Sequence, residues 1–392
     1  MSLFWRATTH TFSGTGNREI PKYWPPSQFE QDPSNIPDDK SYNTHYDPST
    51  AANKEGVYHM YEDANSKERS AAEPVPIPRF VTKRYIPTHT IGKEGSQGPG
   101  MTLLVLPGMG VPKEMFEPML EKLLSLLKES VVQVDEIWSL DMPFSGETAL
   151  VNPVGYMYAY LPLLASQELP DELVPRHPSS NGEEPVRKNI HVISHSLGAQ
   201  CAMLAAAHSP GIFSSLSVMD PAMIPAGKPL KMLSTLPNDV YLVDIKERYP
   251  DQDSLIADLM SSKRTRGWDE LSVRTFAERA FVSDSNCGIR LAGNPRLQWA
   301  LYYDKETPTQ CYDRLTDIRV PFNAIMPTRP FAVPPEQFKA DIARMPQRTK
   351  VTWISRVTHQ LPYERPDECM KIVSSWLQDM SREKNHREQA RL

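Results

Sequence analysis

The sequence predicts an α/β protein whose mostly parallel sheet is covered by helices on both faces. Short, fully apolar runs that are typical of buried strands recur along the chain, and segments with the apolar spacing of helices lie between them. In residues 187–200, RKNIHVISHSLGAQ, an apolar run passes directly into a helix rich in small residues. Strands that alternate with helices in this way are typical of parallel sheets.

Length and composition exclude several other classes of protein. The chain has 392 residues, enough for one large α/β domain with an insertion or for two domains. A net charge of −5 gives no basic surface for nucleic acid, and four cysteines without metal-ligand or disulfide-framework spacing suit a reducing compartment. No apolar run approaches the roughly 18 residues of a membrane span, and the N-terminus lacks the apolar stretch of a signal peptide. We therefore expect neither a transmembrane segment nor secretion.

The first elements follow from local patterns. Residues 1–78 are rich in Pro, Asn, Ser and Asp, so we expect an extended arm or a partly disordered leader. Residues 79–87 (RFVTKRYIP) predict an antiparallel strand, which a Gly/Ser-rich hairpin region follows. Residues 101–106 (MTLLVL) predict a buried strand that leads into a helix, and residues 134–141 predict another strand.

The later elements complete an α/β core with one insertion. They are a helix at 197–208, strands at 216–220, 318–326 and 349–355, and a last helix at 366–380. Nearly a hundred residues with helical patterns interrupt this series, and we expect them to form a cap over the site. The predicted organisation is an arm (1–78), the first part of the core (79–220), a helical cap (221–317), the second part of the core (318–380) and a polar tail (381–392).

The most specific chemical signal is the Ser-His-Ser-Leu-Gly turn. It has the form of a nucleophile elbow, in which a sharp strand-to-helix turn presents a serine, here Ser196, at the edge of the sheet. The residues two before and two after the serine must be small because they crowd each other, and Ser194 and Gly198 are small. Ser194 departs from the usual glycine. In isolation such a string is more often a surface turn, but the flanking strand and helix favour the elbow.

A serine nucleophile needs a base and an acid, which follow it in the order acid, then histidine. His359 lies in the loop between the last predicted strand and the last helix. The usual loop for the acid offers only Glu336 and Asp341, and both lie in a predicted helix. Asp220 ends the strand after the elbow, at the carboxyl edge of the sheet. Asp220 is therefore the expected acid, with Glu336 in reserve; the alternative is that Asp220 only caps a turn.

Two backbone N–H groups are expected to stabilise the oxyanion. One belongs to Leu197, which follows the nucleophile, and the other to Met109 in the glycine-flanked turn after strand 101–106. A glycine-rich turn after a strand could instead bind phosphate. This one lacks the Gly-Lys-Ser/Thr ending of nucleotide loops, which makes that alternative weak.

Together, four motifs resemble those of α/β-hydrolases over about residues 79–380: SHSLG, LPGMGVPKEMFEP, EIWSLDMPFSGETALVNP and the histidine loop SRVTHQLPYERP. They resemble more closely the fungal peroxisomal branch that includes toxin-biosynthesis hydrolases, a yeast peroxisomal lipase and a mycophenolic-acid acyl-CoA hydrolase. The resemblance implies an α/β-hydrolase fold with an eight-stranded sheet and an inserted cap, and an acid after the strand that follows the elbow, at Asp220. One further departure is Gly146-Glu147-Thr148 where Gly-Asp-Ser is typical.

Residues of the cap and the tail are candidates for binding. The aromatic residues that could line an acyl pocket are Trp268, Phe276, Trp299 and Tyr302. They could equally join the cap to the core or to a second subunit in a homodimer. Lys263, Arg264 and Arg266 are candidates for a coenzyme A phosphate, although a solvated helix face explains them as well. The ending Ala390-Arg391-Leu392 is a conservative variant of the peroxisomal Ser-Lys-Leu signal.

These observations predict a serine hydrolase, and the resemblance together with the C-terminal signal implies that it cleaves the acyl-CoA thioester of a bulky lipophilic acid in fungal secondary metabolism. No metal or cofactor is expected, because a serine and its base provide the nucleophile. The expected partners are the small substrate and a peroxisomal import receptor, with the peroxisome as location and the cytoplasm as alternative. A carboxylesterase or lipase is the alternative activity. A non-hydrolytic binding protein or biosynthetic helper on the same scaffold is the alternative of another class.

Overall fold

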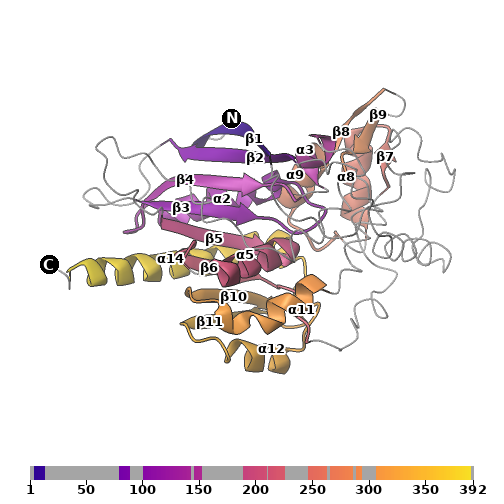
Figure 1. Ribbon diagram of the computed structural model, residues 1–392. Coiled ribbons are helices and arrows are strands. Elements are labelled where there is room, and N and C mark those ends of the chain that lie inside the picture. Colours follow the sequence, from indigo (N-terminus) through magenta and orange to yellow (C-terminus); the bar gives the residue numbers. More distant parts are fainter. Residues whose placement is uncertain are drawn as a thin grey trace, which may run out of the picture.

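The computed structural model describes residues 4–13, 79–88, 100–142, 145–151, 189–209, 211–225, 246–262, 265–285, 288–293 and 306–389. The strands of its main sheet are β1 (Trp5–Ser13), β2 (Arg79–Pro87), β3 (Met101–Leu106), β4 (Val134–Leu140), β5 (Asn189–His195), β6 (Ser215–Met219), β10 (Phe322–Pro327) and β11 (Thr349–Ile354). In this part of the chain they form an eight-stranded sheet in the order β1-β2-β4-β3-β5-β6-β10-β11 (Figure 1). From β4 to β11 neighbouring strands are parallel, whereas β2 is antiparallel to both β1 and β4. The predicted mostly parallel sheet is confirmed.

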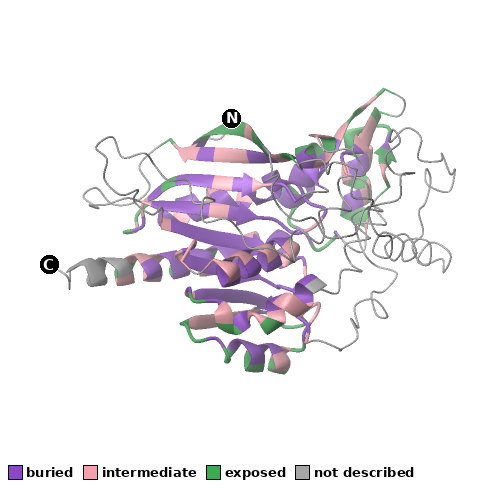
Figure 2. Ribbon diagram, in the orientation of Figure 1, coloured by how far each residue is buried: buried purple, intermediate pink, exposed green. Residues whose placement is uncertain are grey.

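Helices cover both faces of the sheet. The helices are α2 (Glu117–Leu127) and α14 (Pro366–Gln389) on one face, and α5 (Ser196–His208), α11 (Glu306–Asp313) and α12 (Pro335–Ile342) on the other. Strands β3, β5, β6 and β10 are buried along nearly their whole length (Figure 2). Continuous apolar runs are what central parallel strands require, because neither of their faces meets water.

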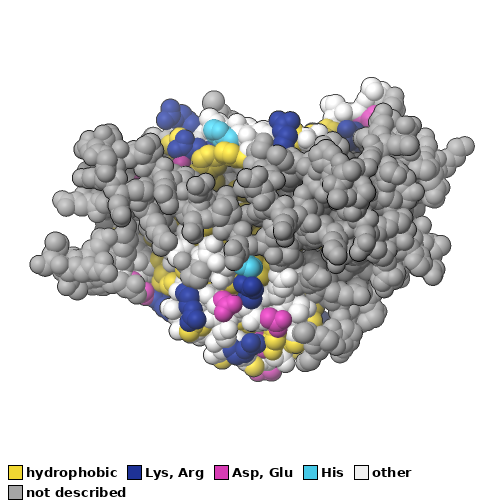
Figure 3. All heavy atoms as spheres, viewed as in Figure 1, with side chains coloured by type: hydrophobic (Ala, Val, Ile, Leu, Met, Phe, Trp, Pro, Cys, Tyr) yellow, Lys and Arg dark blue, Asp and Glu magenta, His cyan; other side chains and the backbone are white. Residues whose placement is uncertain are grey.

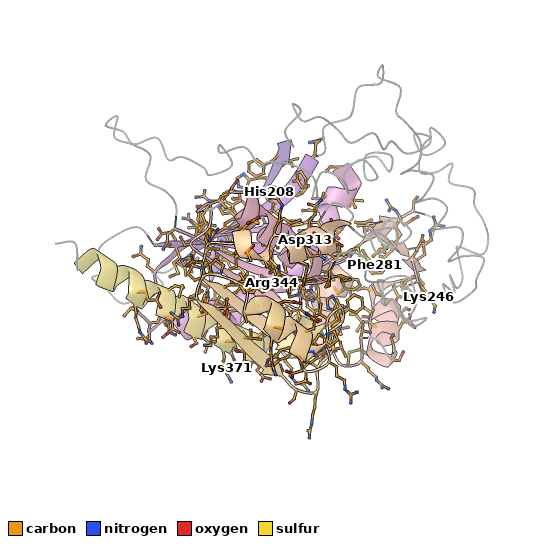
Figure 4. All side chains as sticks on the ribbon, turned by 60° about the horizontal axis from the view of Figure 1, so that its bottom comes forward. His208, Lys246, Phe281, Asp313, Arg344 and Lys371 are labelled. Carbon is orange, nitrogen blue, oxygen red and sulfur yellow. The ribbon has the colours of Figure 1, made fainter. Side chains whose placement is uncertain are left out.

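Polar contacts tie the outer helices together on the α5 side. The Arg314 guanidinium lies 3.1 Å from His208 Nδ1 at the end of α5. The Arg344 guanidinium lies 4.7 Å from the centre of the Tyr312 ring in α11. Figure 4 shows His208, Asp313 and Arg344 in this region. In Figure 3, acidic and basic side chains are interspersed over the lower part of the described surface.

The cap lies at the carboxyl ends of the parallel strands (Figure 1). Its elements are β7 (Arg248–Tyr249), α8 (Gln252–Ser261), α9 (Glu270–Arg279), β8 (Phe281–Asp284) and β9 (Gly288–Leu291). The three strands pair in the order β7-β9-β8, so the predicted helical cap also contains a small sheet. These strands have two to four residues, which is too few for the alternation of apolar and polar residues that identifies a strand in a sequence. Figure 4 shows Phe281 and Lys246 in this part of the cap, and α9 contacts the 3₁₀ helix η4 (Lys113–Phe116) of the core.

Two other boundaries differ from the sequence-based expectation. Strand β1 pairs with β2 along its whole length, and Trp5 packs on Tyr85 with ring centroids 5.2 Å apart, although the prediction assigned this strand to an arm. Most β1 residues are exposed, so the sequence of this strand does not show the alternation of apolar and polar residues that would identify it. The rest of the predicted arm lies outside the described residues. Helix α14 continues to Gln389, beyond the predicted end at Met380. No helix in the described part of the chain is long and apolar enough to cross a membrane.

Candidate active site

Three polar side chains from distant parts of the sequence meet at the carboxyl edge of the sheet. Ser196 directly follows β5, Asp220 directly follows the neighbouring strand β6, and His359 lies in the loop after β11. His359 Nε2 is 2.8 Å from Ser196 Oγ, and His359 Nδ1 is 2.7 Å from Asp220 Oδ2. The structure therefore brings together the serine, the histidine and the aspartate that the sequence analysis singled out.

The chemistry of the donors assigns the protons. An ionised carboxylate can only accept, so the bond to Asp220 places a proton on His359 Nδ1. Nε2 of the neutral ring then accepts the hydroxyl proton of Ser196. Asp220 is almost fully buried and the His359 side chain is 14% exposed. This arrangement can take a proton from a serine hydroxyl and hold the resulting imidazolium beside a carboxylate.

Backbone strain is concentrated in the same three segments. In the described part of the chain, the non-glycine residues with positive φ are Ser196 (52°), Asp220 (41°) and Arg356 (59°). Two of them belong to the site and the third lies three residues before His359. Such conformations cost about 1–3 kcal/mol each and persist where surrounding contacts enforce them. The strain at Ser196 is what the sharp turn of an elbow requires.

Close packing explains the small residues of the elbow. A Cβ atom on Gly198 would lie 2.3 Å from the carbonyl oxygen of Leu106 and 2.4 Å from that of Pro107, so no side chain fits there. Ser194 is fully buried, and its hydroxyl lies 3.4 Å from the backbone oxygen of Ser217 on β6. A serine in place of the usual glycine therefore finds a hydrogen-bond acceptor on the neighbouring strand.

The turn after β3 lies beside the nucleophile. A Cβ atom on Gly108 would lie 3.3 Å from the Cβ of Ser196, so the backbone of this turn runs close to the serine. The N–H of Gly110 donates to Ser145 Oγ at 3.1 Å. Helix α5 begins at Ser196, so the N–H of Leu197 belongs to the first turn and has no acceptor within the helix. Leu197 and Met109, the middle residue of the turn, therefore lie on backbone next to Ser196; their oxyanion role stays a prediction.

A buried ion pair that the sequence analysis missed holds the next part of this turn. The fully buried Lys113 Nζ lies 3.1 Å from Asp141 Oδ2 and 2.6 Å from Glu147 Oε2. Asp141, which follows β4, also accepts the backbone N–H groups of Lys113 (2.7 Å) and Thr148 (3.2 Å). These contacts and the bond from Gly110 to Ser145 join residues 110–113 to residues 141–148. Asp141 directly follows a strand, as Asp220 does, and this position in the sequence could have identified it as a candidate residue.

Replacing Asp141 with asparagine should remove a pH dependence of the free energy of unfolding. Burial raises the pKa of Asp141 from 3.8 to about 6, against the attraction of Lys113. Between these values the folded protein holds a proton that the unfolded chain has released. Wild-type stability should therefore fall relative to Asp141→Asn as the pH rises through this window, by up to about 3 kcal/mol.

Urea unfolding of both proteins at several pH values from about 4 to about 7 measures this difference. Glu147→Gln is the matched control, because it removes an exposed partner of the same lysine and should leave the pH dependence in place. A stability difference that stays constant, or that favours wild type as the pH rises, would contradict the raised pKa.

The loop after β10, where the acid of such a site is usually found, contributes a backbone N–H and an aromatic ring to the site. Phe331, which follows β10, donates its backbone N–H to Asp220 Oδ2 at 3.3 Å. Its ring stacks on the His359 ring, with centroids 4.6 Å apart and planes at 29°. Glu336, the reserve acid, has a side chain that is 86% exposed and pairs with Lys339 at 3.0 Å. Thus Asp220, not Glu336, is the carboxylate that contacts the histidine.

The described cap aromatics lie in packed interfaces. Trp268 is 6% exposed and packs on Phe276 (5.7 Å) and on Tyr363 (5.0 Å), and Phe276 is fully buried. This burial fits the alternative in which they join the cap to the core. Arg266 is exposed. The other candidate binding residues, Trp299, Tyr302, Lys263 and Arg264, lie outside the described residues. Among the described residues, no group of three or more His, Cys, Asp and Glu side chains could hold a metal ion.

Comparisons with known proteins agree with the fold. Among solved structures, the peroxisomal α/β-hydrolase Lpx1 from Saccharomyces cerevisiae is similar, with a TM-score of 0.63 and 12% identity over 96% of this chain and 90% of that chain. The thioesterase domain from the curacin biosynthetic pathway gives a TM-score of 0.46 and 14% identity over 76% and 95% of the two chains. An esterase from Mycobacterium tuberculosis gives 0.46 and 14% over 79% and 89%. At 12% identity the similarity to Lpx1 concerns the fold alone, and the two TM-scores of 0.46 are too low to add to it.

Sequence comparison supplies the family. No curated protein matches the chain. Residues 103–372 match the model of the alpha/beta hydrolase family, and the sheet, the covering helices and the elbow described above lie largely within this range. The predicted α/β-hydrolase fold is confirmed. Because the match spans well over half of its length, the chain belongs to the alpha/beta hydrolase family.

Proposed function

We propose that this hydrolase cleaves acyl thioesters through an acyl-enzyme on Ser196. The observation that carries the proposal is the pair of hydrogen bonds that links Ser196 Oγ to His359 Nε2 (2.8 Å) and His359 Nδ1 to Asp220 Oδ2 (2.7 Å). A serine hydroxyl is a poor nucleophile until a base removes its proton. A neutral imidazole, oriented by a buried carboxylate, is such a base.

The reaction proceeds in two acyl transfers. Ser196 Oγ attacks the carbonyl carbon while His359 Nε2 takes its proton, and Asp220 stabilises the imidazolium. The tetrahedral intermediate collapses, the bond to the leaving group breaks, and His359 donates the proton to the departing sulfur or oxygen. Water then attacks the acyl-serine with His359 again as base, which releases the acid and restores the serine.

The backbone around Ser196 supports an oxyanion site made by the N–H groups of Leu197 and Met109. Leu197 N–H is in the first turn of α5, where the helix dipole also favours negative charge. Met109 lies between Gly108, which adjoins Ser196, and Gly110, whose own N–H is taken by Ser145. Donors that are fixed before the reaction stabilise the developing charge at no cost in reorganisation.

The preferred substrate class rests on the sequence. The motifs that resemble the fungal peroxisomal branch, and the ending Ala390-Arg391-Leu392, support an acyl-CoA of a bulky lipophilic acid as substrate and the peroxisome as location. The last three residues lie outside the described part of the chain, and an import receptor would bind them. A homodimer through the cap belongs to the same proposal. An oxygen ester is the alternative substrate.

With the lauroyl chain as a lipophilic test group common to all substrates, the coenzyme A thioester is expected to give a kcat/KM at least about tenfold above that of ethyl laurate, a difference of about 1.4 kcal/mol in transition-state binding. This preference could come from the thioester bond or from the nucleotide part of coenzyme A, and the lauroyl thioester of N-acetylcysteamine separates these two causes. It has the same scissile bond and lacks the nucleotide part of coenzyme A. We expect its kcat/KM to lie between those of lauroyl-CoA and ethyl laurate, because the remote part of coenzyme A contributes binding energy.

Steady-state kinetics with the three substrates, with Ser196→Ala as the background control, measure the preference. If ethyl laurate is hydrolysed faster than both thioesters, the protein is a carboxylesterase or lipase and the acyl-CoA proposal fails. Equal values for the two thioesters would remove coenzyme A from the recognised part of the substrate.

A further inference from the structure

A buried histidine lies between the nucleophile, the base and the turn after β3. His195 precedes Ser196 at the end of β5 and is 2% exposed. Its ring centroid is 4.9 Å from that of His359, and the ring of Tyr363 packs edge-on against it at 5.5 Å. On another side, a Cβ atom on Gly108 would lie 2.7 Å from His195 Nδ1. One imidazole therefore lies beside both the base His359 and the turn after β3 that adjoins Ser196.

The hydrogen bonds of this ring fix its protonation. His195 Nε2 lies 2.8 Å from the backbone oxygen of His359, and since a carbonyl can only accept, Nε2 carries the proton. Nδ1 is buried and has no hydrogen-bond partner among the described residues. Burial lowers the pKa of His195 well below its ordinary value, and a positive charge on His359 during the reaction would lower it further, so the ring stays neutral.

Stability alone does not favour a histidine in this place. A buried nitrogen without a partner costs about 1–3 kcal/mol, whereas an apolar side chain of similar size would fill the space without that cost. What the imidazole provides and an apolar side chain lacks is the N–H that reaches the His359 carbonyl. Local conflicts of this kind are expected where function constrains a residue.

Several contacts hold the loop that carries His359, in addition to the stacked ring of Phe331. Asp220 and Ser196 contact the ring of His359. Glu364 accepts the backbone N–H and the hydroxyl of Thr358, both at 2.7 Å, on the residue before the histidine. His195 holds the carbonyl of His359 itself. Because Arg356 in the same loop has a strained φ of 59°, the loop depends on such contacts to keep its conformation.

We propose that His195 is a positioning residue, whose Nε2–H fixes the main chain of His359 so that the imidazole stays aligned between Ser196 and Asp220. The proposal rests on the proposed function of Ser196 and His359. A displacement of about 1 Å in a catalytic group can cost about 100-fold in rate. The anchor acts on the backbone of the base, and His195 itself need not touch the substrate.

The matched variants His195→Gln and His195→Met test this role. Both side chains are unbranched and of similar length, but only the glutamine amide can donate to the His359 carbonyl. His195→Met should lower kcat, and the second-order rate of labelling by a fluorophosphonate, about 10- to 100-fold with little change in KM. His195→Gln should stay within about threefold of wild type, because it keeps the donor. Thermal unfolding of each variant verifies that it is folded.

Each outcome decides one claim. If wild type is not labelled, or Ser196→Ala is labelled equally well, the proposed function fails and not only the role of His195. If wild type is labelled and His195→Met reacts at the wild-type rate, the anchor is unnecessary. If both variants lose activity equally, the imidazole ring is needed for its shape or for folding and not for its N–H, which also overturns the proposal.

Discussion

Asp220→Asn is expected to lower kcat/KM about 10⁴-fold. In the structure the Asp220 carboxylate accepts from His359 Nδ1 at 2.7 Å and from the N–H of Phe331 at 3.3 Å. An asparagine side chain carries no charge to stabilise the imidazolium, and in the orientation that places its amide nitrogen at the Oδ2 position it favours the tautomer in which Nε2 carries the proton. His359 could then no longer take the proton of Ser196. KM should change little, because Asp220 lies behind the histidine.

Glu336→Gln is the matched control for this experiment. Glu336 occupies the part of the chain where the acid is usual, but its exposed side chain pairs with Lys339 on the same helix. We expect its kinetics to stay within about twofold of wild type, as for surface changes in general. Near-normal turnover by Asp220→Asn together with a large loss in Glu336→Gln would move the acid to Glu336.

The positions of the three site residues could be predicted because strand ends fix them. Ser196, Asp220 and His359 each follow a parallel strand, and the carboxyl ends of parallel strands lie at one edge of a sheet. The Ser-His-Ser-Leu-Gly turn is a local sequence pattern, so the strained φ of Ser196 could be expected from the sequence alone. Buried apolar runs such as Met101–Leu106 also carry a strong local signal.

What the sequence did not predict depends on contacts across the fold. His195 and Lys113 owe their roles to partners far along the chain, His359 and Asp141, and nothing in their local sequence points to those partners. Phe331 contacts the site through a backbone N–H, which every residue except proline has, and through a ring that meets His359 only in the folded chain. Strand β1 has an exposed surface and pairs with a strand more than sixty positions away, so it carries no apolar period.

Ser196→Ala is expected to reduce turnover about 10⁶-fold, the loss typical of a nucleophile that acts as a unit with its base. The variant removes only the hydroxyl oxygen that lies 2.8 Å from His359 Nε2. Alanine meets the same constraint as serine at a φ of 52°, so the elbow should keep its shape and the protein its stability. Substrate binding should be retained, because the backbone donors and the surrounding side chains are unchanged.

Mass spectrometry after treatment with a fluorophosphonate tests the acyl-enzyme most directly, since this reagent forms a stable bond only with an activated serine. The account predicts one adduct per wild-type chain, on the peptide that contains Ser196, and none on Ser196→Ala. His359→Ala should label far more slowly, because the hydroxyl loses its base. Wild-type protein that remains unlabelled, or an adduct that persists in Ser196→Ala, would contradict covalent catalysis by Ser196 and favour a non-hydrolytic role for this scaffold.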